Sequence, residues 1–243
     1  MPLSLLCAYE ERELIVPLST RSFLSSVSIS PLKGSAFSED YLKTLREILE
    51  FDLNQNGSCS VEPQEGSDFH IDLELIGKNL SALIELKRGG VTKTLGPYAL
   101  CGTLSSDRRV LHKFHDDLAQ IITGKRGIAS SQILFAIQFP EKTPQGYEWR
   151  SEIWGADYDG ENKRQITGEH SYCISPVFLP YEGDYTRGKF LYVNYKKGQP
   201  KLYIAPLNAQ RGEPFLSLRG NQLLPTLSPK GDLLAFISDA SGR

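Results

Sequence analysis

The residues best suited to chemistry are two histidines and a neighbouring carboxylate, His112, His115 and Asp116. A spacing of three brings two imidazole rings near one face of a helix, where they could share a metal ion. No third ligand is recognisable beside them, so a solvated helix face or a packing role is the favoured interpretation. The other two histidines, His70 and His170, are isolated in the sequence and have no assignable reactive partner.

The acidic segment 157–162 is the second candidate site, because its alternating carboxylates resemble part of a calcium-binding loop. An EF-hand loop needs glycine at its sixth position and glutamate at its twelfth. Counted from Asp157, these positions hold Asn162 and Gly168. The Asp159-Gly160 pair is instead typical of a tight turn between two strands, so we expect a β-hairpin turn and no metal.

The remaining candidate chemistry is that of cysteine and serine nucleophiles. The four cysteines, Cys7, Cys59, Cys101 and Cys173, match no metal-ligand spacing, so we expect no zinc. In an exported protein Cys59 and Cys101 could pair within the first domain, but the odd remainder and the lack of a CxxC pair favour separate structural thiols. The sequence contains no GxSxG elbow, no HExxH motif and no glycine-rich phosphate loop. We therefore expect a non-catalytic protein with no catalytic residues, no cofactor and no metal.

Aromatic residues of the C-terminal half could form a ligand platform. They are Trp149, Trp154, Tyr158, Tyr192, Tyr195 and Tyr203. At strand spacing such residues more often fill the core of a β-sheet structure, and that is the interpretation we favour.

The composition is that of an ordinary globular protein of 243 residues, with 40% hydrophobic and 23% charged residues, which is enough for two modest domains. The formal net charge is −2 and the basic residues are scattered, so the chain lacks the electrostatic footprint of a nucleic-acid-binding protein. No stretch approaches the roughly 18 apolar residues of a membrane-spanning helix. We expect neither nucleic-acid binding nor a membrane span.

The N-terminal segment 1–8 is apolar and runs directly into charged residues. This pattern is typical of the end of a secretory signal's hydrophobic region followed by a mature start, although the basic leader is missing. A plain apolar N-terminus is the alternative. A signal remnant at 1–8 predicts export.

Residues 9–128 are predicted to form a two-layer α/β domain. After extended runs at 14–16 and 23–29, Ser38 is a plausible N-cap for a helix that Asn56-Gly57 ends. Apolar residues recur along this helix at helical spacing: Tyr41, Leu42, Leu45, Ile48 and Leu49.

Three strands and a second helix complete the predicted domain. The segment 71–75 alternates apolar and acidic residues, and the segments 80–87 and 91–95 follow as a hairpin closed by glycines. The second helix ends at Gly124. Its apolar face is Leu111, Phe114, Leu118, Ile121 and Ile122, and its polar residues lie mostly opposite: His112, Lys113, Asp116, Asp117 and Gln120.

Residues 129–243 are predicted to be all-β and internally repeated. Four pairs of similar residues lie 49 positions apart: Ile153-Trp154 with Leu202-Tyr203, Pro176 with Pro225, Phe178 with Leu227, and Pro180 with Pro229. A repeat of about 40–50 residues built of short strands indicates the blades of a β-propeller. Two such units cannot close a ring, so we expect an incomplete propeller of about two blades and an α+β fold overall.

Three segments resemble the TolB family of periplasmic Tol-Pal system proteins, and the likeness covers nearly the whole chain from Tyr9 onward. The first is residues 112–127 followed by a strand at 133–138, which is similar to the family's junction of helix, turn and first propeller strand. The second is residues 152–167 and the third is residues 227–238, and both resemble the family's blade repeats.

The third segment departs from the family's Trp-Ser-Pro-Asp-Gly repeat, because Leu227 and Lys230 replace Trp and Asp. The resemblance implies an N-terminal α/β domain, a six-bladed propeller and no catalytic activity. It also implies a periplasmic scaffold for outer-membrane integrity and cell division. The implied partners are a Pal-like peptidoglycan-associated lipoprotein at the propeller and a TolA-like inner-membrane protein at the mature N-terminal strand.

By this resemblance the candidate partner-binding segment is the run at the mature N-terminus, which could add a strand to a partner's sheet edge. It comprises Tyr9, Glu10, Glu11, Arg12, Glu13, Leu14, Ile15 and Val16. The alternative is that residues 14–16 simply complete their own domain.

A second hypothesis comes from the enzyme class. Related blade repeats occur in the gating propellers of prolyl-oligopeptidase-like serine hydrolases, which also require a GxSxG-bearing hydrolase domain. That hypothesis predicts neither the N-terminal α/β domain nor an export signal. The scaffold is therefore the favoured interpretation.

Overall fold

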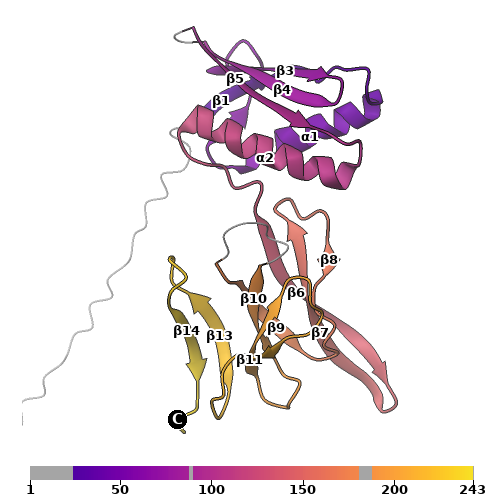
Figure 1. Cartoon of the computed structure of the whole chain (residues 1–243), viewed down its shortest axis with the longest axis vertical. Coiled ribbons are helices and arrows are strands. Elements are labelled where there is room, and N and C mark those ends of the chain that lie inside the picture. Colours follow the sequence, from indigo (N-terminus) through magenta and orange to yellow (C-terminus); the bar gives the residue numbers. More distant parts are fainter. Residues whose placement is uncertain (1–23, 88–89, 181–187, 243) are drawn as a thin grey trace, which may run out of the picture.

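The computed structural model describes residues 24–87, 90–180 and 188–242, so the candidate segment at 9–16 and the predicted signal remnant at 1–8 lie outside the described residues. Two helices and five strands form an α/β part, and the next nine strands form three further sheets (Figure 1). Neither described helix is long and apolar enough to cross a membrane.

Helix α1 (Glu39–Gln55) begins where the sequence predicts it. The Ser38 hydroxyl caps the helix by accepting the backbone N–H of Tyr41 at 3.3 Å, and Glu39 and Asp40 lie in the first turn. Carboxylates are favourable there because the unpaired N–H groups carry partial positive charge. The buried side of α1 comprises Leu42, Leu45, Ile48, Leu49, Asp52 and Leu53. One acid is therefore buried among apolar residues.

The sheet of the α/β part has the strand order β2–β1–β3–β4–β5. Strand β1 pairs in parallel with β2 and β3, whereas β3, β4 and β5 form an antiparallel meander. The strands are β1 (Ser25–Ile29), β2 (Cys59–Val61), β3 (Phe69–Ile76), β4 (Asn79–Leu86) and β5 (Val91–Ala99). Ile71, Leu73 and Ile84 belong to one core with the helices, which confirms the predicted alternation.

Helix α2 (Leu104–Thr123) is buried on two sides. Its apolar face packs in the α/β core through Leu111, Phe114 and Leu118. The polar residues His112, His115 and Asp116 are also buried, with 1%, 0% and 2% of their surface exposed. A solvated polar face is therefore wrong for these three residues, because they pack against neighbouring segments on both sides. The predicted stop is confirmed, since Gly124 adopts φ +74°.

The rest of the described chain forms three antiparallel sheets with the orders β6–β7–β8, β9–β10–β11–β12 and β13–β14. Their strands are β6 (Gln132–Thr143), β7 (Gly146–Asp157), β8 (Arg164–Gln165), β9 (Cys173–Phe178), β10 (Lys189–Asn194), β11 (Lys201–Pro206), β12 (Glu213–Pro214), β13 (Gln222–Leu227) and β14 (Leu234–Ser238). Within the described residues these sheets do not close into a ring (Figure 1).

The 49-residue repeat is present in the backbone as well as in the sequence. Strands β9 and β13 begin at positions 173 and 222, and β8 and β12 begin at 164 and 213. Ser175 and Leu224 share this spacing, and both adopt a positive φ, +52° and +49°, which L-residues rarely adopt. Each lies at a shift in strand pairing. The second sheet is thus a complete four-stranded unit, and its neighbours contain three and two strands of that unit.

A buried carboxylate fixes the second sheet to the segment before it. Glu169 accepts hydrogen bonds from the Tyr192 hydroxyl at 2.7 Å, the Gly212 N–H at 2.9 Å and Lys196 Nζ at 3.0 Å. Burial raises the pKa of Glu169, but these donors outweigh burial and hold the pKa below its ordinary value. The ionised form of Glu169 is therefore part of the folded structure.

We expect Glu169→Ala to lower the free energy of unfolding by about 2–4 kcal/mol, because the Tyr192 hydroxyl and the Gly212 N–H lose their buried acceptor. Lys196 is 46% exposed and can turn to water, which limits the loss. Urea unfolding followed by circular dichroism measures the change. Glu141→Gln, which removes one partner of a part-exposed ion pair with Arg150, is the control and should change stability by less than about 1 kcal/mol. Equal losses in the two variants would contradict this role of Glu169.

Candidate functional site

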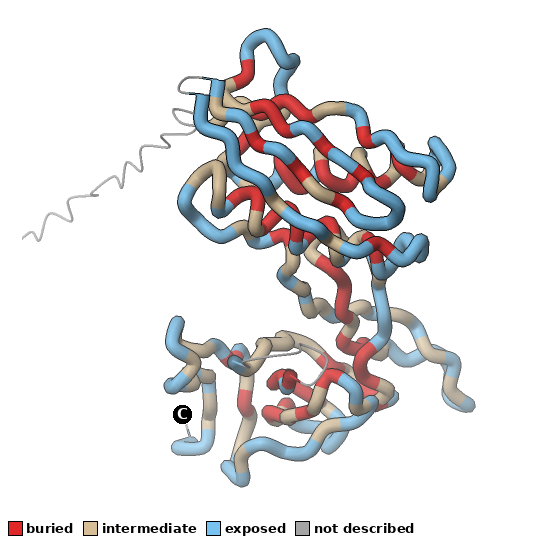
Figure 2. Tube along the Cα trace, turned by 45° about the horizontal axis from the view of Figure 1, so that its top comes forward, coloured by how far each residue is buried: buried red, intermediate tan, exposed pale blue. Residues whose placement is uncertain are grey.

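A cluster of charged side chains lies between the α/β part and the first of the following sheets, and all of its members except the half-exposed Arg109 are largely buried. We name it the junction cluster, and it comprises Asp52, Arg108, Arg109, His112, Asp157 and Asp159. Its acids come from α1, from the last residue of β7 and from the turn that follows it, and its bases come from α2. Burial continues from the helices through this region into the sheet (Figure 2). Three separate segments of the chain therefore meet at one charged site.

The turn at 157–162 has the hairpin geometry that the sequence predicts. The Asp157 N–H donates to the Glu161 carbonyl and the Gly160 N–H donates to the Asp157 carbonyl, both at 2.9 Å. Gly160 adopts φ +83°, which glycine tolerates without steric cost. The carboxylates of the turn contact α2. Across the described residues, no group of three or more His, Cys, Asp or Glu side chains is arranged to hold a metal ion.

Two arginines of α2 bind this turn. The Arg108 guanidinium donates to Asp159 Oδ2, and Arg109 Nε lies 3.2 Å from Asp157 Oδ2. Both aspartate side chains are 4% exposed, so water competes little for them. The Asn162 amide adds a hydrogen bond to the Ser105 carbonyl at 3.0 Å. The first two turns of α2 are thus attached to the first sheet.

His112 connects acids from two different segments. Its Nδ1 lies 2.7 Å from Asp52 Oδ2, and its Nε2 lies 3.4 Å from Asp159 Oδ2. Burial lowers the pKa of His112, but the hydrogen bond with Asp52 and the charges of Asp52, Asp159 and Asp157 together raise it above its ordinary value. The surroundings of His112 therefore favour the imidazolium form.

Asp116 holds the connection between α2 and β6. Its Oδ1 accepts the Ala129 N–H at 2.7 Å, and its Oδ2 accepts the Ser130 N–H at 3.0 Å and the Ser130 hydroxyl. Gly127 approaches so closely that a Cβ there would lie 2.7 Å from the Asp116 Cα. Burial raises the pKa of Asp116, but hydrogen bonds from His115, Ser130 and Ala129 outweigh it and lower the pKa to about 2.

A cavity of about 350 Å³ lies beside the junction cluster, between α2 and the connection to β6. Its walls carry charges of both signs, including Arg109, Lys113, Asp117 and Arg126. Lys113 is paired with Asp117 at 3.2 Å and Arg109 with Asp157 at 3.2 Å. The arrangement offers an attachment between two parts of the chain and contains no activated nucleophile.

His70 is not isolated, which corrects the sequence-based expectation. Its Nδ1 lies 2.8 Å from the Ser28 hydroxyl and its Nε2 lies 3.2 Å from Asp72 Oδ1. A serine-hydrolase triad has the opposite order, with the acid on Nδ1 and the serine on Nε2. The Ser28 hydroxyl also contacts Ser67 Oγ at 2.8 Å, and Ser28 is 3% exposed. This network connects β1 to β3 and to the segment before β3, and presents no accessible nucleophile.

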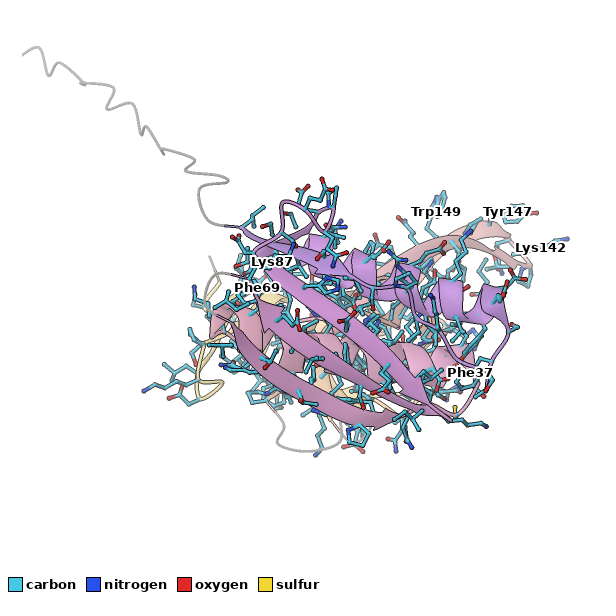
Figure 3. The ribbon with its side chains drawn as sticks, turned by 90° about the horizontal axis from the view of Figure 1, so that it is seen from above. Phe37, Phe69, Lys87, Lys142, Tyr147 and Trp149 are labelled. Carbon is cyan, nitrogen blue, oxygen red and sulfur yellow. The ribbon has the colours of Figure 1, made fainter. Side chains whose placement is uncertain are left out.

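The aromatic residues divide between core and surface. Tyr192 and Tyr203 are buried, as expected of core residues, but Trp149 is 64% exposed and that expectation is wrong for it. The reason is that β8 pairs with the end of β7, at Trp154 and Gly155, and among the described residues no third strand is paired with the rest of the β6–β7 hairpin. Figure 3 shows Lys142, Tyr147 and Trp149 together on the projecting end of this hairpin.

The junction cluster contains residues that sequence reasoning did not select. Asp52 is one acid in an amphipathic helix, and Arg108-Arg109 is one basic doublet among several. The sequence did contain one signal for this site. His112, His115 and Asp116 lie close together on the polar side of α2, and they could have been expected to pack against a neighbouring segment. The segment 9–16, which was the candidate partner-binding segment, lies outside the described residues.

No model of a known protein family matches the chain. The chain is 38% identical over 260 residues to "Protein TolB homolog" from Protochlamydia amoebophila (strain UWE25), a match that covers 96% of this chain and 55% of that protein. It is 34% identical over 212 residues to the protein of the same name from Chlamydia pneumoniae, which covers 84% of this chain and 47% of that protein. The chain spans about half the length of these curated relatives.

A solved structure has the same fold. The crystal structure of TolB from Acinetobacter baumannii matches with a TM-score of 0.62 at 20% identity, covering 90% of this chain and 56% of that one. The match therefore includes the α/β part and the sheets that follow it. The predicted fold class, an α/β domain followed by an incomplete β-propeller, is confirmed.

We expect Asp116→Asn to loosen the connection to β6 and to lower the free energy of unfolding by about 1–3 kcal/mol, because the amide cannot accept all three hydrogen bonds. In the unsubstituted chain this contribution is complete above the ordinary aspartate pKa of 3.8 and is lost as the pH falls towards about 2. Urea unfolding at several pH values and proteolysis of the connection measure both effects. Glu47→Gln, a 61% exposed acid on α1, is the control. The same pH dependence in Asp116→Asn as in the unsubstituted chain would contradict this role.

Proposed function

The chain belongs to the TolB family, and on this basis we propose that it is part of a non-catalytic periplasmic scaffold of the Tol-Pal envelope system. In this proposal the scaffold links inner-membrane Tol proteins to a Pal-like peptidoglycan-associated lipoprotein and supports outer-membrane integrity and cell division. The observation that carries the proposal is the 38% identity over 96% of the chain with a TolB homologue.

The junction cluster supports a scaffold whose two parts act together. A protein that binds one partner near its N-terminus and another on its propeller can transmit an effect between them only through the connection of the two parts. Here that connection is made of ion pairs to buried carboxylates and of hydrogen bonds that Asp116 accepts, rather than of a free linker. This geometry suits a protein that relates two binding partners.

We also propose the domain limits that the sequence suggested, with a signal remnant at 1–8, an α/β domain at 9–128 and a partial propeller at 129–243. The described elements support the second limit, because α2 (Leu104–Thr123) is the last element of the α/β part and β6 (Gln132–Thr143) is the first strand of the following sheets. The bonds of Asp116 to Ala129 and Ser130 lie between these two elements.

The alternative, a gating propeller of a serine hydrolase, accounts only for the blade repeats. The TolB homologue is similar over 96% of the chain, so its likeness extends through the α/β part as well. Because the likeness to the TolB homologue includes the α/β part as well as the blade repeats, we prefer the scaffold.

We expect the full-length gene product to co-purify with a Pal-like lipoprotein after crosslinking in envelope extracts. The physical reason is that a complete propeller presents one continuous binding surface, of which the described sheets form only a part. Mass spectrometry of the crosslinked species identifies the partner, and an unrelated lipoprotein of the same envelope is the control. Absence of the Pal-like protein from the crosslinks, with the bait shown to be folded, would contradict the proposed function.

We expect Ile15→Pro to weaken binding of a TolA-like protein by about tenfold, because proline removes a backbone donor that an added strand needs. Ile15→Val keeps the donor and the β-branched shape and should bind as the unsubstituted protein does. Isothermal titration of the full-length protein with the TolA-like domain measures the difference. Equal affinities for the two variants would show that residues 9–16 do not bind as a strand, and Pal-like binding should be the same in both.

A further inference from the structure

We propose that His112 is a proton-dependent latch between the α/β part and the first β-sheet. The latch is closed when both ring nitrogens carry a proton and opens when one proton is lost. The proposal concerns the chain itself and does not rest on the proposed function. It follows from the position of His112 between acids of two parts of the molecule.

The charge balance of the junction cluster depends on His112. The side chains of its three acids, Asp52, Asp157 and Asp159, are only 0%, 4% and 4% exposed. The acids face two arginines, of which Arg108 is 15% exposed and Arg109 is 53% exposed. With a neutral imidazole, one buried negative charge has no positive counterpart. Such a charge is costly because the surroundings screen it much less than water does. A protonated His112 makes the cluster neutral, with three charges of each sign.

The hydrogen-bonding geometry also favours a His112 ring that carries a proton on both nitrogens. Each ring nitrogen of His112 faces a carboxylate, Nδ1 at 2.7 Å from Asp52 and Nε2 at 3.4 Å from Asp159. A neutral imidazole has one N–H, and the stronger contact with the fully buried Asp52 keeps that proton on Nδ1. The lone pair of Nε2 then faces Asp159 Oδ2. When His112 loses one proton, the Nε2 lone pair and the Asp159 carboxylate therefore repel each other. This repulsion acts on the turn of the first sheet.

The other groups around His112 do not supply this response. On α2 itself, His115 contacts Asn56 at 3.1 Å and Asp116 at 3.5 Å, neither of which belongs to the turn after β7, and Asp116 is engaged by the connection to β6. On the turn, the Tyr158 ring packs edge-on against His112 at 6.5 Å, and burial raises the Tyr158 pKa, which keeps the phenol neutral. The arginines Arg108 and Arg109 stay charged throughout.

The direction of the pH response follows from the raised pKa of His112. The stabilisation is complete below the ordinary histidine pKa of 6.5 and is lost as the pH rises through the higher value of the folded state. The latch is thus closed in acid and opens towards alkaline pH. Because Asp159 lies on the turn that Arg108 also binds, opening weakens the attachment of the whole first sheet.

The latch can be tested with the 243-residue chain carrying spin labels at Gln120→Cys on α2 and Gln145→Cys at the exposed end of the β6–β7 hairpin. Cys7→Ser and Cys101→Ser remove two thiols that would also react with the spin label. Cys59 and Cys173 are kept because they are buried. Electron-spin distance measurements are made across the pH range in which NMR follows the His112 imidazole. We expect the distance distribution to broaden and shift with the same midpoint as His112.

Two variants make the test specific. Asp159→Asn should remove the pH-dependent distance change and lower the protonation constant of His112 by about tenfold. His112→Gln should give a distance that is constant over the same pH range. His170→Gln, a 71% exposed histidine of the sheets, is the matched control and should behave as the unsubstituted chain. A distance that stays constant while His112 titrates, or a change that persists in Asp159→Asn or His112→Gln, would overturn the proposal.

Discussion

The contact of α2 with the turn between β7 and β8 places the first sheet relative to the α/β part, and the later sheets pack onward from that sheet. Arg108, Arg109 and His112 bind the two aspartates of the turn, while Asp52 holds His112 from the opposite side. An apolar junction would allow many similar orientations, because hydrophobic attraction has no direction. Paired charges allow few, since each misplacement leaves a buried charge without a partner.

Most of the fold was predictable because its elements have local causes. Ser38 caps α1, Gly124 ends α2, and alternation along β3 places Ile71 and Leu73 in the core, and each of these signals lies within a few residues of the element it defines. The 49-residue repeat was predictable for a related reason, because equivalent strands need equivalent residues. The repeat extends to the positive φ of Ser175 and Leu224, although neither residue type indicates such a backbone conformation.

The candidate site was not predictable in the same way, because its residues are far apart in the chain. A polar residue on a helix is usually solvated, and nothing near His112 in the sequence indicates that Asp52 and Asp159 will approach it. The exposure of Trp149 was missed for a similar reason, since it depends on how far β8 accompanies β7. Tertiary pairing decided both outcomes, and a pattern read along one segment contains no information about it.

Helix α2 combines the two attachments in one element. The turn of the first sheet is bound through Arg108, Arg109 and His112, and the connection to β6 is bound about one turn later by Asp116. A helix transmits displacement along its axis with little internal change, because its backbone hydrogen bonds fix each residue relative to the next. A movement of α2 relative to the first sheet therefore acts on the ion pairs at the turn and on the Asp116 bonds at the connection to β6. The same helix packs in the α/β core through Phe114, so a change in that core has a direct physical route to the first sheet.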